Sequence, residues 1–183
     1  MENGPEMSYA FNSGLQSEAN VEVHKYYGGV VTAVALLAII VQAFLHRFGR
    51  WAEFADLPLL VTIYFGVSKR NPVSGMLLGA VIGIAQDALS HDNPIGLYGI
   101  AKTVVGYVAS SVGARIDTEH PAARFALVFI LYHVHQLVYA SIERVLLNRP
   151  TPFFTLHLLI VSLVSATIAV ILFSLLDRLR RQS

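Results

Sequence analysis

The chain has no cysteine and little charge, and both shortages narrow what it can be. Without cysteine it forms no disulfide, no thiolate metal site and no thiol nucleophile. Charged residues make up 14% and hydrophobic residues 55% of the chain, whereas soluble domains carry roughly 25% charged residues. The formal net charge is +1, which gives no reason to expect binding to nucleic acid. This composition is typical of a protein that lies in a membrane.

Long apolar runs occupy most of the sequence, and the segments between them are too short for a separate soluble domain. We therefore expect an all-α fold, a polytopic membrane helical bundle of about six transmembrane helices. The predicted organisation is a polar acidic tail (1–27), a single bundle (28–177) and a basic cytoplasmic tail (178–183). The apolar runs lie near residues 28–46, 57–67, 73–90, 94–114, 122–142 and 153–176.

The second apolar run is short for a membrane span. Asp56 can cap a helix there, and Pro58 suits the first turn. The run covers roughly 16 Å as a helix, against about 30 Å for a bilayer core. Two topologies are possible: six crossings with the N-terminus inside, or five crossings with the N-terminus outside. Both place Lys69, Arg70 and the C-terminus in the cytoplasm. The distribution of Lys and Arg does not choose between these two topologies.

Glycine recurs at every fourth residue of the third run and at every seventh residue of the fourth run. Small residues at such spacings let membrane helices approach closely. We expect the two glycine stripes to face one another in a hairpin, or to form the surface for a partner helix. The stripes consist of Gly75, Gly79 and Gly83 on one run and Gly99, Gly106 and Gly113 on the other.

Each of these two runs also carries one ionisable residue, Asp87 in the first and Lys102 in the second. Asp87 lies about 6 Å and Lys102 about 12 Å from the turn between them. An unpaired charge at mid-membrane costs about 2.5–3.5 kcal/mol on insertion scales. We therefore predict that Asp87 and Lys102 form an intramembrane charge pair. Tight helix packing, a substrate or ion pathway and a protein-partner groove all remain compatible with it.

No set of residues with catalytic or metal-binding spacing stands out. His133 and His135 point about 200° apart on a helix, so they do not chelate one metal together. We expect them to make interhelical hydrogen bonds. The sequence has no phosphate-binding loop and no His-Glu-x-x-His motif. The interpretation is a protein that is not an enzyme and has no cofactor and no metal.

Three short motifs resemble the family of the rod shape-determining protein MreD, best over residues 56–114. Asp56-Leu-Pro58 opens a short helix that contains Tyr64. Asn71-Pro-Val-Ser-Gly75 leads into the glycine stripe that ends at Asp87, and Pro94-Ile-Gly96 opens the following run. The resemblance implies a non-enzymatic scaffold subunit of the bacterial cell-shape and peptidoglycan elongation machinery, the elongasome. It also implies the bacterial inner (cytoplasmic) membrane as the location.

The same resemblance implies partners and a likeness to a second group of proteins. A single-span MreC-like protein would bind directly, through helix packing. RodA, the elongation transpeptidase and MreB filaments would be indirect partners, reached through that protein. Family members are similar to the six-helix substrate-binding subunits of energy-coupling-factor transporters, which favours six crossings. The alternative function is therefore a substrate-binding membrane subunit of a vitamin or small-molecule transporter.

Overall fold

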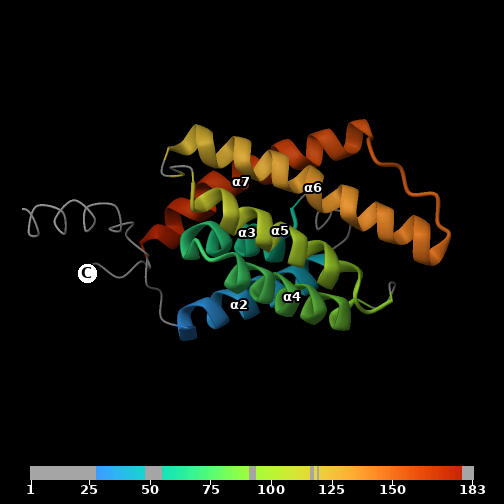
Figure 1. Cartoon of the computed structure of the whole chain (residues 1–183), viewed down its shortest axis with the longest axis horizontal. Helices are drawn as coiled ribbons and strands as arrows, with labels where there is room; N and C mark the ends of the chain where they lie inside the picture. The colour runs from blue at the N-terminus through green and yellow to red at the C-terminus, as the bar shows by residue number, and fades with distance from the viewer. Residues whose placement is uncertain (1–27, 48–54, 91–93, 116–117, 119, 179–183) are drawn as a thin grey trace, which may run out of the picture.

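The computed structural model describes residues 28–47, 55–90, 94–115, 118 and 120–178. Within these ranges the chain forms six α-helices and no strand, so the prediction of an all-α bundle is confirmed (Figure 1). The predicted acidic tail, the turn at 91–93 and the end of the basic tail lie outside the described residues. The helices are α2 (Gly28–Arg47), α3 (Leu57–Lys69), α4 (Pro72–Leu89), α5 (Leu97–Gly113), α6 (Pro121–Leu147) and α7 (Leu156–Asp177).

Successive helices run in opposite directions between the two ends of the bundle (Figure 1). Four of them, α2, α4, α6 and α7, are long and apolar enough to cross a membrane. The end of α3, the start of α4, the end of α5, the start of α6 and the end of α7 share one end of the molecule (Figure 1). We call it the α3–α4 end, and the other the α4–α5 end, after the connections that lie there.

The short helix α3 lies at the centre of the bundle. It contacts each of the five other described helices. Every residue from Pro58 to Val67 is buried. Its 13 residues extend about 20 Å at 1.5 Å per residue, less than the roughly 30 Å of a bilayer core. Because neighbouring helices surround α3, they shield Pro58 to Val67 from lipid although the helix is short.

The helices begin where the sequence supplies capping side chains. The Asp56 carboxylate accepts a hydrogen bond from the Leu59 amide at 3.0 Å, ahead of α3. Asn71 accepts from the Val73 amide at 3.0 Å and Thr155 from the Leu158 amide at 3.0 Å, at the starts of α4 and α7. These bonds satisfy backbone donors that have no partner within the helix. The capping role predicted for Asp56 is confirmed.

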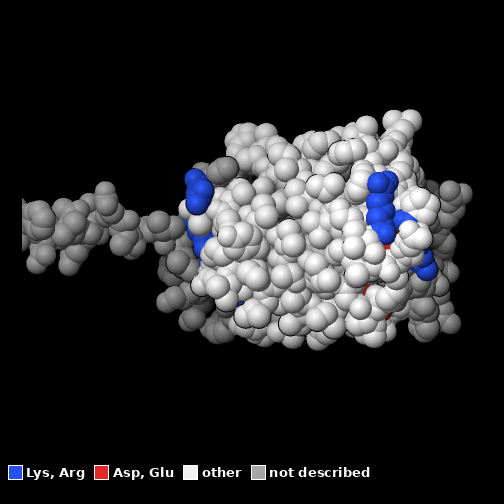
Figure 2. All heavy atoms as spheres, turned by 45° about the vertical axis from the view of Figure 1, so that its right-hand side comes forward, with Lys and Arg blue, Asp and Glu red and all other residues white. Residues whose placement is uncertain are grey.

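Apolar side chains cover the outside of the bundle between two charged ends. Figure 2 shows Lys and Arg at the two ends of one face, with uncharged residues across the band between them. This arrangement is what a bilayer core flanked by headgroups requires. The strongly exposed apolar residues of the long helices include Leu37, Ile40, Leu77, Val81, Ile130 and Ile171.

Candidate functional site: a glycine seam and buried charges

The glycines of α4 and α5 face one another, and the two helix backbones touch along them. A methyl group added to Gly75 would overlap the carbonyl oxygen of Gly106, and one added to Gly79 would overlap the carbonyl oxygen of Lys102. A methyl group on Gly83 would overlap the carbonyl oxygen of Tyr98. Only glycine fits at these positions, because any side chain would push the helices apart. We call this contact the glycine seam.

The seam continues onto the central helix. A methyl group added to Gly113 would lie 2.5 Å from the carbonyl oxygen of Val67, in the last turns of α3. Gly99 has more room, because a methyl group added to it would lie 3.0 Å from its nearest neighbour, a side-chain carbon of Ile84. The glycine stripes therefore hold α3, α4 and α5 together inside the chain. They are not exposed for a partner helix.

Asp87, near the end of α4, caps the start of α5. Its carboxylate accepts hydrogen bonds from the amides of Gly96 at 2.9 Å, Tyr98 at 3.1 Å and Gly99 at 3.0 Å. Only 1% of Asp87 is exposed. The residue before α5, Gly96, has φ 115° and no side chain to act as a cap. A carboxylate from the neighbouring helix thus satisfies these donors and meets the positive end of the helix dipole.

Lys102 is fully buried in α5 and pairs with Asp56. Its Nζ lies 2.5 Å from Oδ2 of Asp56, while Oδ1 of the same carboxylate caps α3. The Nζ also lies 5.2 Å from the centroid of the Tyr98 ring, close enough for a cation–π interaction. The predicted direct pair between Asp87 and Lys102 is therefore wrong. Asp87 binds backbone amides instead, and the partner of Lys102 comes from another helix.

The reason for this error is the depth of α3. Since α3 is short and central, the Asp56 carboxylate at its start meets the side chain of Lys102 from the second turn of α5. Asp56 is 46 residues from Lys102 in sequence, and no local spacing links them. The sequence did contain a signal for this pair. Asp56 precedes an apolar run too short to span a bilayer, so the start of the helix that it caps could lie inside the membrane.

Aromatic and polar side chains of α6 complete the surroundings of the Asp56–Lys102 pair. Tyr98 stacks against Tyr139 at 5.0 Å and His135 at 6.1 Å between ring centroids. His135 is 5% exposed, and its Nε2 has no hydrogen-bond partner among the described residues. His133 bonds to the Phe129 carbonyl of its own helix at 2.8 Å. The interhelical hydrogen bonds predicted for His133 and His135 are not found among the described residues, since His133 bonds within its own helix and Nε2 of His135 has no partner there.

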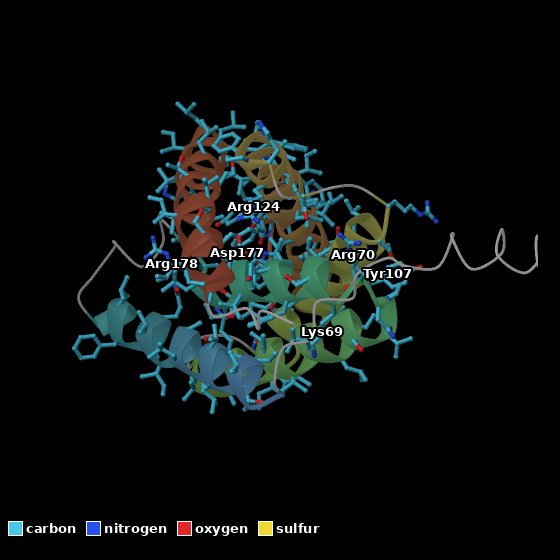
Figure 3. The ribbon with its side chains drawn as sticks, turned by 90° about the vertical axis from the view of Figure 1, so that its left-hand side faces the viewer. Lys69, Arg70, Tyr107, Arg124, Asp177 and Arg178 are labelled. Atoms are coloured by element: carbon cyan, nitrogen blue, oxygen red, sulfur yellow. The ribbon has the colours of Figure 1, made fainter. Side chains whose placement is uncertain are left out.

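A second polar network joins three helices at the α3–α4 end. The Tyr64 hydroxyl of α3 donates to Asp177 of α7 at 2.9 Å. Asp177 also pairs with Arg124 of α6, with 2.7 Å between Nη1 and Oδ2. Figure 3 shows Arg124 and Asp177 together at this end. Sequence reasoning assigned no such role to Tyr64 or Asp177, because 113 residues separate them.

The remaining chemistry of the described residues is limited. They contain no group of three or more His, Cys, Asp or Glu side chains that could hold a metal ion. Asp87, Asp56 and Lys102 all serve to cap helices or to neutralise one another inside the bundle. These contacts can therefore fix the positions of the helices in an apolar medium.

These features define a polytopic helical membrane protein, in which a glycine seam and internally satisfied charges fix a short central helix. The chain matches the family model of the rod shape-determining protein MreD over residues 24–180. It therefore belongs to the MreD family, and the match extends well beyond the region that carried the resemblance in the sequence. Comparison with curated proteins and with solved structures gave no match. Family membership indicates a membrane protein with a role in rod-shape determination and cell elongation.

Proposed function

We propose that the chain is a non-enzymatic scaffold subunit of the cell-shape and peptidoglycan elongation machinery. In this proposal it lies in the bacterial cytoplasmic membrane with its C-terminus in the cytoplasm. It binds a single-span MreC-like protein by helix packing, and acts indirectly on RodA, the elongation transpeptidase and MreB filaments. Family membership supports the cellular role, and the fold supports the mechanical one.

One observation carries the scaffold proposal: the buried charges hold helices together. Asp87 caps α5 from α4, and Asp56 caps α3 while it pairs with Lys102 of α5. Removing either partner of the pair would leave an unpaired charge in an apolar medium, which is strongly unfavourable. The charges therefore favour one fixed arrangement of α3, α4 and α5. A frame fixed in this way is suited to presenting constant outer faces to another helix.

The partner helix must then pack on the lipid-facing side of the bundle. The glycine seam lies between α4 and α5 and cannot accept a further helix. Single exposed apolar residues are available on each long helix, for example Leu37 of α2, Leu77 of α4, Ile130 of α6 and Ile171 of α7. Since membrane helices associate through packing complementarity, contact on one of these faces is what the proposal expects.

The natural absence of cysteine makes a direct test possible. Single cysteines at Leu37, Leu77, Ile130 and Ile171 would each be combined with single cysteines along the span of the MreC-like partner, in native membranes. Oxidation should give cross-links from one face only, with a helical periodicity along the partner. Cross-links from none of the faces would contradict helix packing, and co-purification of ATP-hydrolysing coupling subunits would favour the transporter alternative.

A further inference from the structure

The cationic side chains of the described residues divide into paired and unpaired groups. Lys102, Arg124 and Arg149 each lie within 4.0 Å of a carboxylate. Arg144 lies over the Phe153 ring and donates to the Thr151 carbonyl. Four further cations, at the α3–α4 end, have no ion pair and no side-chain hydrogen bond among the described residues. They are Lys69, Arg70, Arg115 and Arg178.

Three of these four cations follow the close contact between the ends of α3 and α5. Gly113 of α5 packs directly against the backbone of Val67 in α3. Lys69 and Arg70 follow Val67 by two and three residues, and Arg115 follows Gly113 by two. In Figure 3, Lys69 and Arg70 lie on the opposite side of this end from Arg178. We call the group of Lys69, Arg70 and Arg115 the basic corner.

Arg70 occupies a backbone conformation that arginine rarely adopts. Its φ is 51°, and among the described non-glycine residues only Asn148 shares a positive φ. This left-handed position ends a helix, where glycine or asparagine is the usual residue. Asn148 fits that preference, whereas Arg70 does not. An arginine at a position whose backbone favours glycine motivates the hypothesis that its side chain has a role.

The surroundings of the basic corner suit a phospholipid better than a soluble anion. Lys69 and Arg70 are partly exposed at the edge of the apolar band, where lipid phosphates lie. A guanidinium group binds phosphate through two parallel hydrogen bonds. Directly beyond Arg70, the first turns of α4 expose Val73 and Leu77, with 64% and 63% of each residue accessible. A bound headgroup would thus continue into acyl chains that cover these two side chains.

We propose that the basic corner binds the phosphate headgroup of an anionic phospholipid, with its acyl chains along the start of α4. Lys69 and Arg115 supply positive charge, and Arg70 supplies the paired donors. The net attraction depends on lipid charge, since each cation near an anionic leaflet adds to it. The preference is therefore for an anionic headgroup such as phosphatidylglycerol over the zwitterionic phosphatidylcholine.

The test measures the thermal midpoint of the purified full chain in detergent, with phosphatidylglycerol, phosphatidylcholine or inorganic phosphate added. A ligand that binds only the folded state raises the midpoint. Phosphatidylglycerol should raise it by several degrees more than phosphatidylcholine, and inorganic phosphate should leave it unchanged. Equal shifts with both lipids would overturn the proposal, and a shift with phosphate alone would assign the corner to a free anion.

Arg70→Gly separates binding from folding, because glycine suits the left-handed position. This variant should keep the lipid-free midpoint and lose at least half of the phosphatidylglycerol shift. Lys69→Gln with Arg115→Gln should lose a similar share. Asn148→Gly is the matched control, since it changes the other left-handed cap at the α4–α5 end. A full phosphatidylglycerol shift in Arg70→Gly, or an equal loss in Asn148→Gly, would overturn the proposal.

Discussion

The pairing of Lys102 with Asp56 makes a quantitative prediction for a double-mutant cycle. Asp56→Asn removes the charge but keeps an oxygen that can accept the Leu59 amide, so α3 keeps its cap. Lys102→Met keeps an unbranched side chain of similar length without charge. Each single change leaves the other charge buried and unpaired, because Lys102 is 0% and Asp56 14% exposed at the side chain.

The expected magnitudes follow from that burial. Each single variant should lower the free energy of unfolding by about 3–5 kcal/mol, as for other buried pairs that lose one partner. The double variant leaves no buried charge at this site and should cost less than the two single changes together. The coupling energy should be about 2 kcal/mol or more, within the range seen for contacting residues.

Unfolding in mixed micelles, followed by far-ultraviolet circular dichroism during titration with a denaturing detergent, would measure these values. The matched control is the cycle of Asp87→Asn with Lys102→Met, because Asp87 binds backbone amides and not the ammonium group. Its coupling energy should stay below about 1 kcal/mol. Additivity of the Asp56 and Lys102 variants, or stronger coupling of Asp87 to Lys102, would refute the assignment of the pair.

Three further predictions test the other contacts. Gly79→Leu should separate α4 from α5 and abolish the folded state in circular dichroism, whereas Val81→Leu on the lipid face should leave it intact. Asp87→Ala should cost about 3 kcal/mol or more, since it leaves the first amides of α5 without an acceptor; unchanged stability would contradict the cap. Tyr64→Phe should cost about 1–2 kcal/mol and speed proteolysis at the end of α7, because Asp177 loses one donor.

Much of the fold could be predicted from local sequence alone. Hydropathy located the helices, and Asp56 and Pro58 marked the start of α3 through capping chemistry. The spacing of the glycines placed Gly75, Gly79 and Gly83 on one face, where the structure has them against α5. The spacing of residues around a helix and the capping of its ends depend on residues close together in sequence. Both can therefore be predicted without knowing which helices are in contact.

The partners of the buried charges could not be predicted in the same way. The donors to Asp87 are backbone amides, which leave no mark in the pattern of side chains. The Tyr64–Asp177 bond joins helices far apart in sequence. Both kinds of contact depend on which helices are neighbours and at what depth each one starts.

The sequence by itself determined that this is an apolar helical bundle with close glycine contacts and that its few internal charges need partners. Only the tertiary structure decided that Lys102 neutralises Asp56, while Asp87 closes the start of α5. The physical reason is that a helical repeat fixes the direction in which a side chain points around its own axis. Its height relative to a distant helix is fixed only when the short α3 is enclosed by the other five.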